Sequence, residues 1–191
     1  LFLTYLIAIG AGSVMGYFGG KTDMFGLRLV EIWANVPFLY MVIILVSVMP
    51  GWWGVGWQVS SLLFIMVLFS WTGMTYYIRA AVYKEKARDY VSAAKVIGAG
   101  PSRIIFRHLL PNVISTLVTF APFTIAAAIS SITALDFLGY GLPPPTPSWG
   151  ELLKQAVGNL KTAPWIVIST VSALVLTLTL VTFVGEALRE A

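Results

Sequence analysis

The sequence predicts an all-α membrane protein, a polytopic helical bundle with about five membrane spans. Its composition is the first reason, because 58% of the 191 residues are hydrophobic and only 10% are charged, against about 25% charged in an ordinary soluble domain. The long charge-free stretches and the unequal charge of the segments between them are two more. So little charge excludes a soluble enzyme and a disordered tail, and the absence of cysteine excludes a disulfide-stapled module.

Four stretches without any charged residue place the spans. They cover residues 1–20, 32–78, 109–135 and 162–185, and a helix needs about 20 mostly apolar residues to cross a bilayer. The second stretch is long enough for two helices, and its middle, residues 50–57, is dense in the Pro, Gly and Trp typical of an interfacial turn. The predicted spans are therefore 1–18, 33–49, 60–78, 113–135 and 165–185.

The basic residues between these spans predict the orientation. Loops 19–32 and 79–112 and the C-terminal tail hold ten of the twelve Lys and Arg, whereas loops 50–59 and 136–164 hold two. By the positive-inside rule, the first group is cytoplasmic, and the C-terminus with it. Residue 1 then lies on the outer side within a hydrophobic helix, so we expect an N-terminal span and a cytoplasmic N-terminus to precede it.

Polar residues inside the predicted spans are few. Every Asp and Glu falls outside them, which argues against a proton- or sodium-driven carrier, because such carriers use intramembrane carboxylates. Gly12 and Gly16 form a small-xxx-small pair that indicates close helix packing. Four hydroxyl side chains either line a path for a polar solute or bond to neighbouring helices and their own backbone. They are Thr72, Thr75, Ser130 and Ser131.

The basic loop 79–112 predicts a short helix over residues 90–97. Asp89 suits its N-cap, and Gly98 suits the left-handed position after its end. Eight residues are marginal as an isolated helix in water, so we expect it to dock against a partner; an interfacial helix held to lipid headgroups is the open alternative. Its apolar face has low relief because two of the four side chains are methyl groups. That face consists of Tyr90, Ala93, Ala94 and Ile97.

A second short helix is predicted after the break at residues 98–100. Pro101 is well placed to open it, and Arg103 and Arg107 give it a basic face. Pro111 is expected to stop it, because the residue before a proline avoids the helical region. His108 is the single histidine, and we expect a structural role for it.

This loop resembles the EAA loop of permease subunits in bacterial ABC importers. The match rests on Ala93-Ala94, Gly98 and Leu110-Pro111. Two positions differ, because Ser92 stands where the signature has Glu and His108 where it has Ile.

Further segments resemble one branch of that family, the dipeptide/oligopeptide/nickel importers. They are residues 107–112, which read Arg-His-Leu-Leu-Pro-Asn, and the Pro-rich outer segment 137–150. Residues 28–37 and 185–189 are most similar to the Yej-type peptide and microcin importers, in their second permease subunit.

The resemblance implies a type I ABC importer permease fold, with residues 1–191 as one transmembrane permease domain in the bacterial inner membrane. Loop 79–112 would be its cytoplasmic coupling loop and loop 136–164 its outer, periplasmic loop. The implied partners are a homologous second permease, two cytoplasmic ATPase subunits and a periplasmic or lipid-anchored solute-binding protein. By alternating access the assembly would import peptides or peptide-like solutes. ATP and Mg²⁺ would bind the ATPase subunits, so this chain would be no enzyme and would hold no cofactor.

The resemblance also assigns candidate site residues. Those expected to meet the ATPase subunit are Asp89, Tyr90, Ser92, Ala93, Ala94, Lys95, Ile97 and Gly98. Those expected to support the coupling loop are Pro101, Arg103, Arg107, His108, Leu110 and Pro111. In the outer loop, Pro144, Pro145 and Trp149 are expected to contact the binding protein.

Other kinds of site do not fit the residues. Segment 98–103 lacks the Gly-Lys-Ser/Thr ending of a phosphate loop, and one histidine without cysteine cannot build a metal cluster or a Cys–His pair. Orientation and anionic lipid account for the basic loop without nucleic acid. Three alternatives stay open: a membrane protein that only recruits a cytoplasmic partner through loop 79–112, a permease for nickel or another small solute, and a passive channel or secondary carrier.

Overall fold

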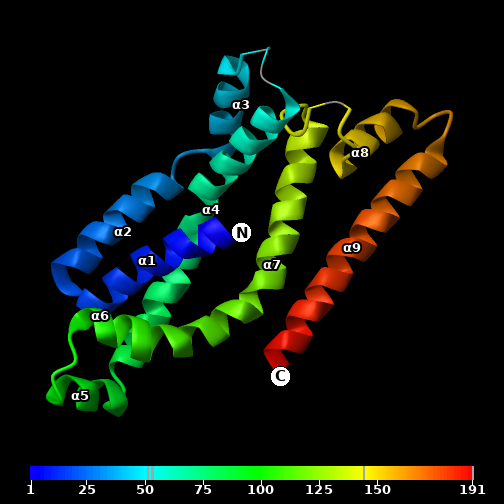
Figure 1. The fold of residues 1–191 in the computed structure, drawn as a ribbon. Coiled ribbons are helices and arrows are strands. Elements are labelled where there is room, and N and C mark those ends of the chain that lie inside the picture. Colours follow the sequence, from blue (N-terminus) through cyan, green and yellow to red (C-terminus); the bar gives the residue numbers. More distant parts are fainter. Residues whose placement is uncertain (51, 53, 144, 191) are drawn as a thin grey trace. The chain divides into compact units, whose positions relative to one another are not determined.

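The computed structural model describes residues 1–50, 52, 54–143 and 145–190, and all regular structure in these ranges is helical (Figure 1). The all-α prediction is therefore confirmed. In chain order the helices are α1 (Phe2–Phe18), α2 (Gly20–Ala34), α3 (Phe38–Val48), α4 (Val55–Lys86), α5 (Asp89–Val96), α6 (Pro101–Arg103), the π-helix η1 (Ile104–Leu109), α7 (Leu110–Phe137), α8 (Trp149–Gly158) and α9 (Pro164–Glu190).

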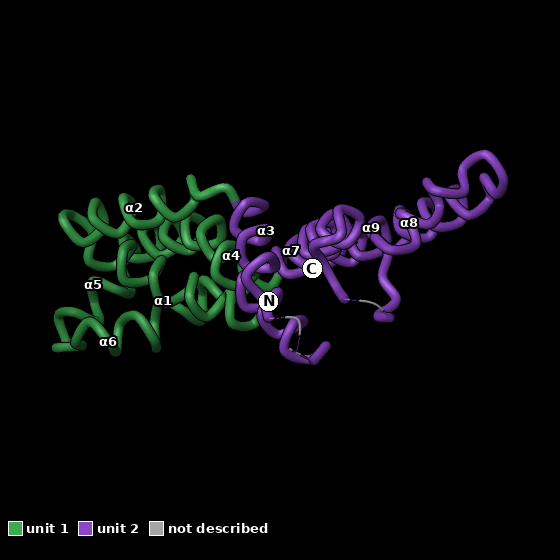
Figure 2. Tube along the Cα trace, turned by 90° about the horizontal axis from the view of Figure 1, so that it is seen from above, with its two compact units in different colours: residues 1–37, 66–118 green, residues 38–65, 119–191 purple. Residues whose placement is uncertain are grey.

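The helices form two compact units, coloured separately in Figure 2. Unit 1 comprises residues 1–37 and 66–118, and unit 2 comprises residues 38–65 and 119–191. The long helices α4 and α7 each contribute to both units. The basic loop therefore belongs wholly to unit 1, and the Pro-rich outer segment wholly to unit 2.

Three of the five predicted spans lie inside long apolar helices. Within the described residues, the helices long and apolar enough to cross a membrane are Val55–Lys86, Leu117–Phe137 and Pro164–Leu188. The first predicted span corresponds to α1, an apolar helix whose 17 residues make it shorter than these three helices. The predicted span 33–49 is interrupted, because Pro37 separates α2 from α3. These two helices are long and apolar enough to cross a membrane only when they are taken together as one broken span.

The predicted loop 19–32 is a helix, α2, and this corrects the sequence-based expectation. Charged residues mark where a chain leaves the hydrocarbon, but they do not decide whether its backbone is helical. Here Lys21, Asp23, Arg28 and Glu31 are interspersed with apolar residues in an unbroken helix, and Val30 is buried inside unit 1. The helix α2 packs against α1.

Close packing of α1 against α4 organises the core of unit 1, as the two small residues predict. A Cβ atom on Gly12 would lie 2.8 Å from the Cβ of Ile78, and one on Gly16 would lie 2.7 Å from the Arg79 carbonyl oxygen. Both distances are too short for real side chains, so these glycines let the two helix backbones approach closely. Ile78 is fully buried at this contact.

Candidate functional site

The short helix α5, at the centre of the basic loop, ends in a Schellman motif. Gly98 has a φ of 84°, the left-handed conformation predicted for it. The Ala99 N–H donates to the Ala94 carbonyl and the Gly98 N–H to the Lys95 carbonyl, both at 3.0 Å, which is the hydrogen-bond pattern of that motif. A Cβ atom on Gly98 would meet no heavy atom within 4 Å, so the backbone conformation alone favours glycine there.

The start of α5 differs from the prediction by one residue. Asp89 is the first residue of the helix and Arg88 is its N-cap, so the assignment of Asp89 as N-cap is wrong. Arg88 has the extended backbone of a cap residue, and its Nε bonds the Glu85 carboxylate at 3.0 Å. Asp89 instead places a negative charge in the first turn, where the helix dipole favours it.

The predicted apolar face of α5 is divided between the interior and the surface. Ala94 is only 3% exposed and is buried together with Val91, whereas Ala93 is exposed. Val96 and Ile97, at the end of the helix, are 87% and 84% exposed. Ala94 thus faces the interior of unit 1, and contact of α5 with a partner stays a prediction. A helix this short needs tertiary contacts to persist, and it uses this methyl group to pack into unit 1.

Tyr90, the remaining member of the predicted face, bonds to two neighbouring helices. Its hydroxyl donates to Glu85 Oε2 at 2.8 Å and accepts a hydrogen bond from Asn112 Nδ2 at 3.2 Å. Asn112 also donates to the His108 carbonyl at 2.8 Å. Burial and the hydrogen bond to Glu85 raise the pKa of Tyr90, so its hydroxyl stays a protonated donor at neutral pH.

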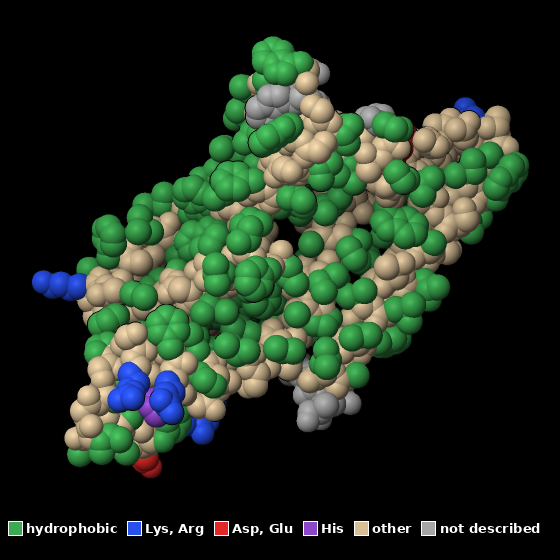
Figure 3. Space-filling model, viewed as in Figure 1, with side chains coloured by type: hydrophobic (Ala, Val, Ile, Leu, Met, Phe, Trp, Pro, Cys, Tyr) green, Lys and Arg blue, Asp and Glu red, His purple; other side chains and the backbone are tan. Residues whose placement is uncertain are grey.

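The other residues predicted to couple or to support the loop differ in how far they are exposed. Pro101 opens α6, as expected, while His108 is half-buried and Leu110 is buried. On the face shown in Figure 3, Lys and Arg side chains gather beside the single histidine of the chain. The exposed polar members of the set are Ser92, Lys95, Arg103 and Arg107.

Pro111 does not stop the helix that contains it. The π-helix η1 runs directly into α7, and the Leu110 N–H donates to the Ile105 carbonyl, five residues earlier. In an α-helix, a proline ring clashes with the carbonyl group four residues before it. The wider π turn ahead of Pro111 gives its ring room, and for this reason the predicted helix end is wrong.

The outer segment after α7 contains a loop and α8. Trp149 is the first residue of α8 and is half-buried, and Pro145 is exposed. Pro144 lies outside the described residues. Contact of these three residues with a binding protein stays a prediction.

Asp136 holds the start of this outer segment in place. It is 5% exposed, and its carboxylate accepts a hydrogen bond from the Leu142 N–H. A Cβ atom on Gly150 would lie 2.2 Å from Asp136 Cβ and 2.5 Å from the Thr133 carbonyl oxygen, so glycine lets α8 approach α7 closely. Asp136 lies one residue beyond the predicted span 113–135, in the last turn of the long apolar helix Leu117–Phe137.

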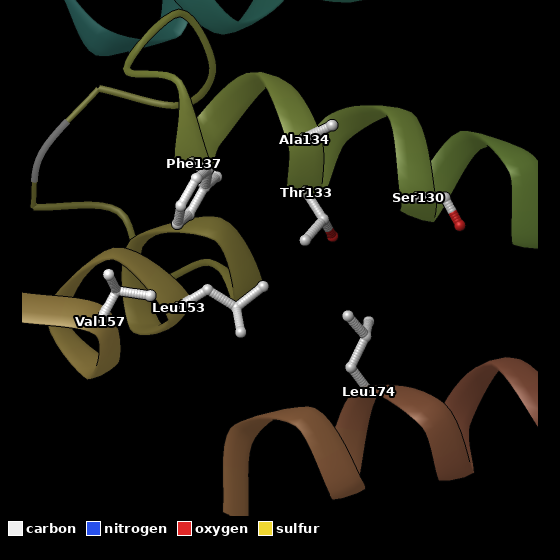
Figure 4. A pocket seen from close by; sticks show the side chains of 7 residues that line it. All are labelled: Ser130, Thr133, Ala134, Phe137, Leu153, Val157 and Leu174. Atoms are coloured by element: carbon white, nitrogen blue, oxygen red, sulfur yellow. The ribbon is translucent and has the colours of Figure 1, made fainter. Parts of the chain in front are cut away.

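A pocket of about 350 Å³ lies between α7, α8 and α9 within unit 2 (Figure 4). Most of its lining is apolar, and Ser130 and Thr133 supply its hydroxyl groups. It is lined by Ser130, Thr133, Ala134, Phe137, Leu153, Val157 and Leu174. Of the four hydroxyl residues proposed to line a solute path, it includes only Ser130.

All four hydroxyl residues of that set donate to a carbonyl of their own helix, Ser130 to Ala126 at 3.0 Å and Thr72 to Phe69 at 3.5 Å, which favours the alternative. Thr75 is fully buried, and its Oγ1 donates to the Trp71 carbonyl at 2.9 Å. Thr72 is buried as well. The Ser131 hydroxyl donates to the Ala127 carbonyl at 2.9 Å. A path along these residues stays a prediction.

Sequence reasoning missed two features of the site. The burial of Val91 could have been predicted, because Val91 precedes Ala94 by three residues and so shares a helix face with it. The bonds of Tyr90 to Glu85 and Asn112 had no comparable signal. Five and 22 residues separate these partners, and neither spacing corresponds to neighbours on one helix.

Comparison with known proteins places these observations in a family. Residues 8–191 match the family described as "Binding-protein-dependent transport system inner membrane component". The chain is 42% identical over 186 residues to the "Peptidoglycan transport system permease protein YejE" of Agrobacterium fabrum, covering 97% of this chain and 47% of that protein. It is 41% identical over 187 residues to the "Inner membrane ABC transporter permease protein YejE" of Escherichia coli, covering 97% and 52%.

A third relative is the "Oligopeptide transport system permease protein OppC" of Haemophilus influenzae. It is 34% identical over 191 residues, covering 100% of this chain and 59% of the relative. The chain thus spans about half the length of the curated relatives it matches.

Proposed function

Because the chain belongs to the family of binding-protein-dependent transport system inner membrane components, we propose that it is a permease subunit of an ATP-driven importer of peptides or peptide-like solutes. The names of two relatives, which concern peptidoglycan and oligopeptide transport, support this class of solute. In this role α5 is the coupling helix, which receives the motion of a cytoplasmic ATPase subunit.

The exposed end of α5 is the observation that carries this role. Val96 and Ile97 lie almost entirely outside the packed surface of unit 1, whereas Val91 and Ala94 anchor the same helix to it. Two adjacent exposed aliphatic side chains on a short, anchored helix suit insertion into an apolar groove of a partner protein. The contact surface of α5 is therefore its C-terminal end, together with the exposed Ala93.

The remaining partners follow from the same role. A homologous permease would complete the pathway, two ATPase subunits would bind ATP and Mg²⁺, and a periplasmic or lipid-anchored protein would deliver the solute. This chain then contributes motion and a path rather than catalysis. Its place is the bacterial inner membrane, with the basic loop and the C-terminus in the cytoplasm.

A charge at the exposed end of α5 tests the coupling contact. Ile97→Asp should leave the protein in the membrane but abolish co-purification of the ATPase subunit and ATP-dependent uptake, because a buried unpaired carboxylate is costly in an apolar groove. Leu160→Asp is the matched control, since Leu160 is also aliphatic and exposed but lies in the predicted outer loop 136–164. Normal ATPase binding and uptake in the Ile97 variant would overturn the assignment.

The wild-type protein separates this proposal from the alternatives. Gentle detergent extraction should bring down an ATPase and a second permease, and membrane vesicles should import a labelled oligopeptide only when ATP is supplied. A cytoplasmic partner without ATPase activity would favour a recruiting protein instead. Uptake without ATP would indicate a channel or secondary carrier, and ATP-dependent uptake of Ni²⁺ but not peptide would reassign the solute.

A further inference from the structure

One phenol joins the coupling helix to the two helices that flank it. Tyr90 lies in α5, Glu85 in the last turn of α4, and Asn112 in the first turn of α7. The Tyr90 hydroxyl bonds both, at 2.8 Å and 3.2 Å. All three residues belong to unit 1.

The hydrogen bonds around this phenol use all the N–H and O–H hydrogens of the Tyr90 hydroxyl and the Asn112 amide. The hydroxyl donates its one hydrogen to Glu85 and accepts from Asn112, and the Asn112 amide uses its second hydrogen on the His108 carbonyl. The other oxygen of Glu85 is held by Arg88 at 3.0 Å. Networks in which every member is satisfied are rigid, because no group gains by rearranging.

The covalent connections of α5 are short segments at its two ends. Residues 87–88 join it to α4, and residues 97–100 join it to α6. Gly98 in the second joint is held by the Schellman motif, whereas a Cβ atom on Gly100 would meet no heavy atom within 4 Å, so Gly100 can absorb movement through backbone rotation. The apolar contacts of Val91 and Ala94 resist separation of α5 from unit 1, but such contacts have no directional preference.

We infer that Tyr90 is a positioning residue that fixes α5 to α4 and α7, so that a displacement of α5 moves both helices instead of being absorbed at its two joints. This inference rests on the proposed function. It differs from the expectation drawn from sequence, in which Tyr90 itself meets the ATPase subunit. Here the partner contacts the far end of the helix, and Tyr90 transmits the displacement.

Tyr90→Phe is the direct test, because it removes the hydroxyl and keeps the ring. In the purified complex reconstituted into liposomes, ATPase activity and subunit co-purification should persist. The amount of solute imported per ATP hydrolysed should fall roughly threefold or more, because without the hydroxyl hydrogen bonds α5 can move without α4 and α7. This ratio reports coupling, and a merely structural role that reduced the amount of folded complex would leave it unchanged.

Two further variants sharpen the result. Tyr83→Phe is the matched control, because Tyr83 is a 65% exposed tyrosine near the end of α4, and its ratio should equal that of the wild type. Asn112→Ala should lower the ratio too, and the double variant with Tyr90→Phe should be no worse than the more affected single variant. Asn112 is exposed, so its replacement should not prevent folding. If Tyr90→Phe does not reach the membrane, the ratio measured for Asn112→Ala tests the positioning role.

The outcomes separate this inference from the proposed function. If the wild-type complex imports solute with ATP and the Tyr90 and Asn112 variants match Tyr83→Phe, the positioning role is wrong and the importer assignment stands. If no ATPase accompanies the wild-type protein, the proposed function fails first.

Discussion

The Asp23 carboxylate in α2 accepts two hydrogen bonds from the Arg79 guanidinium in α4, 56 residues along the chain. The bond from the terminal nitrogen measures 2.5 Å, and the two side chains are 18% and 30% exposed. The ammonium group of Lys86 lies 5.5 Å from the centre of the Tyr17 ring in the same unit. The ion pair thus joins the predicted segments 19–32 and 79–112, and the Lys86 contact joins the second of them to the end of α1.

Breaking this ion pair should destabilise unit 1. Asp23→Asn removes the charge but keeps the shape, and it leaves the half-buried Arg79 unpaired; we expect a loss of about 2 kcal/mol. The exposed pair of Arg28 and Glu31, whose atoms are 2.8 Å apart, is the control, because Glu31→Gln should cost about 0.5 kcal/mol or less. Thermal unfolding in detergent measures both, and equal melting temperatures for the two variants would contradict this ranking.

The close approach of α1 and α4 predicts different costs for identical substitutions on one helix. Gly16→Ala should destabilise the protein by roughly 1–3 kcal/mol, because the new methyl group overlaps the backbone and Val82 of α4. Gly10→Ala should be neutral or slightly stabilising, since no heavy atom lies within 4 Å of its Cβ position. Melting temperatures of the two variants compare them directly, and a tolerated alanine at position 16 would disprove the packing.

A comparable pair of glycines lies in α8 of unit 2. Gly150→Ala should separate α8 from α7 near Asp136, because its Cβ atom would overlap both the side chain and the backbone of α7. Gly158→Ala meets nothing within 4 Å and should be tolerated. Limited proteolysis of the outer segment is the measurement; we expect faster cleavage only in the Gly150 variant, and equal rates would argue against the contact.

The start of α8 depends on a side-chain cap. The Ser148 hydroxyl accepts a hydrogen bond from the Glu151 N–H at 3.1 Å, which satisfies one free donor of the first turn. Ser148→Ala should cost about 1 kcal/mol of local stability, and Ser148→Asp should retain the cap. Hydrogen exchange of the amides at 149–153 checks this, and unchanged protection in the alanine variant would contradict the role of the cap.

Local features of loop 79–112 were predictable from the sequence because each depends on one or two neighbouring residues. Gly98 adopts the left-handed conformation and Pro101 begins a helix, since backbone preferences alone favour both. The helix between Asp89 and Gly98 was found within one residue for the same reason. The helix α2 was not predictable in this way, because the charged residues at 21–31 indicate a segment outside the lipid but do not reveal its backbone conformation.

Hydrophobicity, backbone preference and motif spacing are properties of short stretches. The amino-acid sequence therefore predicts which segments are apolar enough to lie in lipid, where α5 ends and which family the chain resembles. Three other features emerge from the packing of the helices: Ala94 faces inward and Ile97 outward, the helix passes through Pro111, and Tyr90 joins Glu85 to Asn112. Each of these depends on the position of a neighbouring helix. Burial and hydrogen bonding between helices are set by that packing, and the periodicity of one helix does not specify which neighbour covers which face.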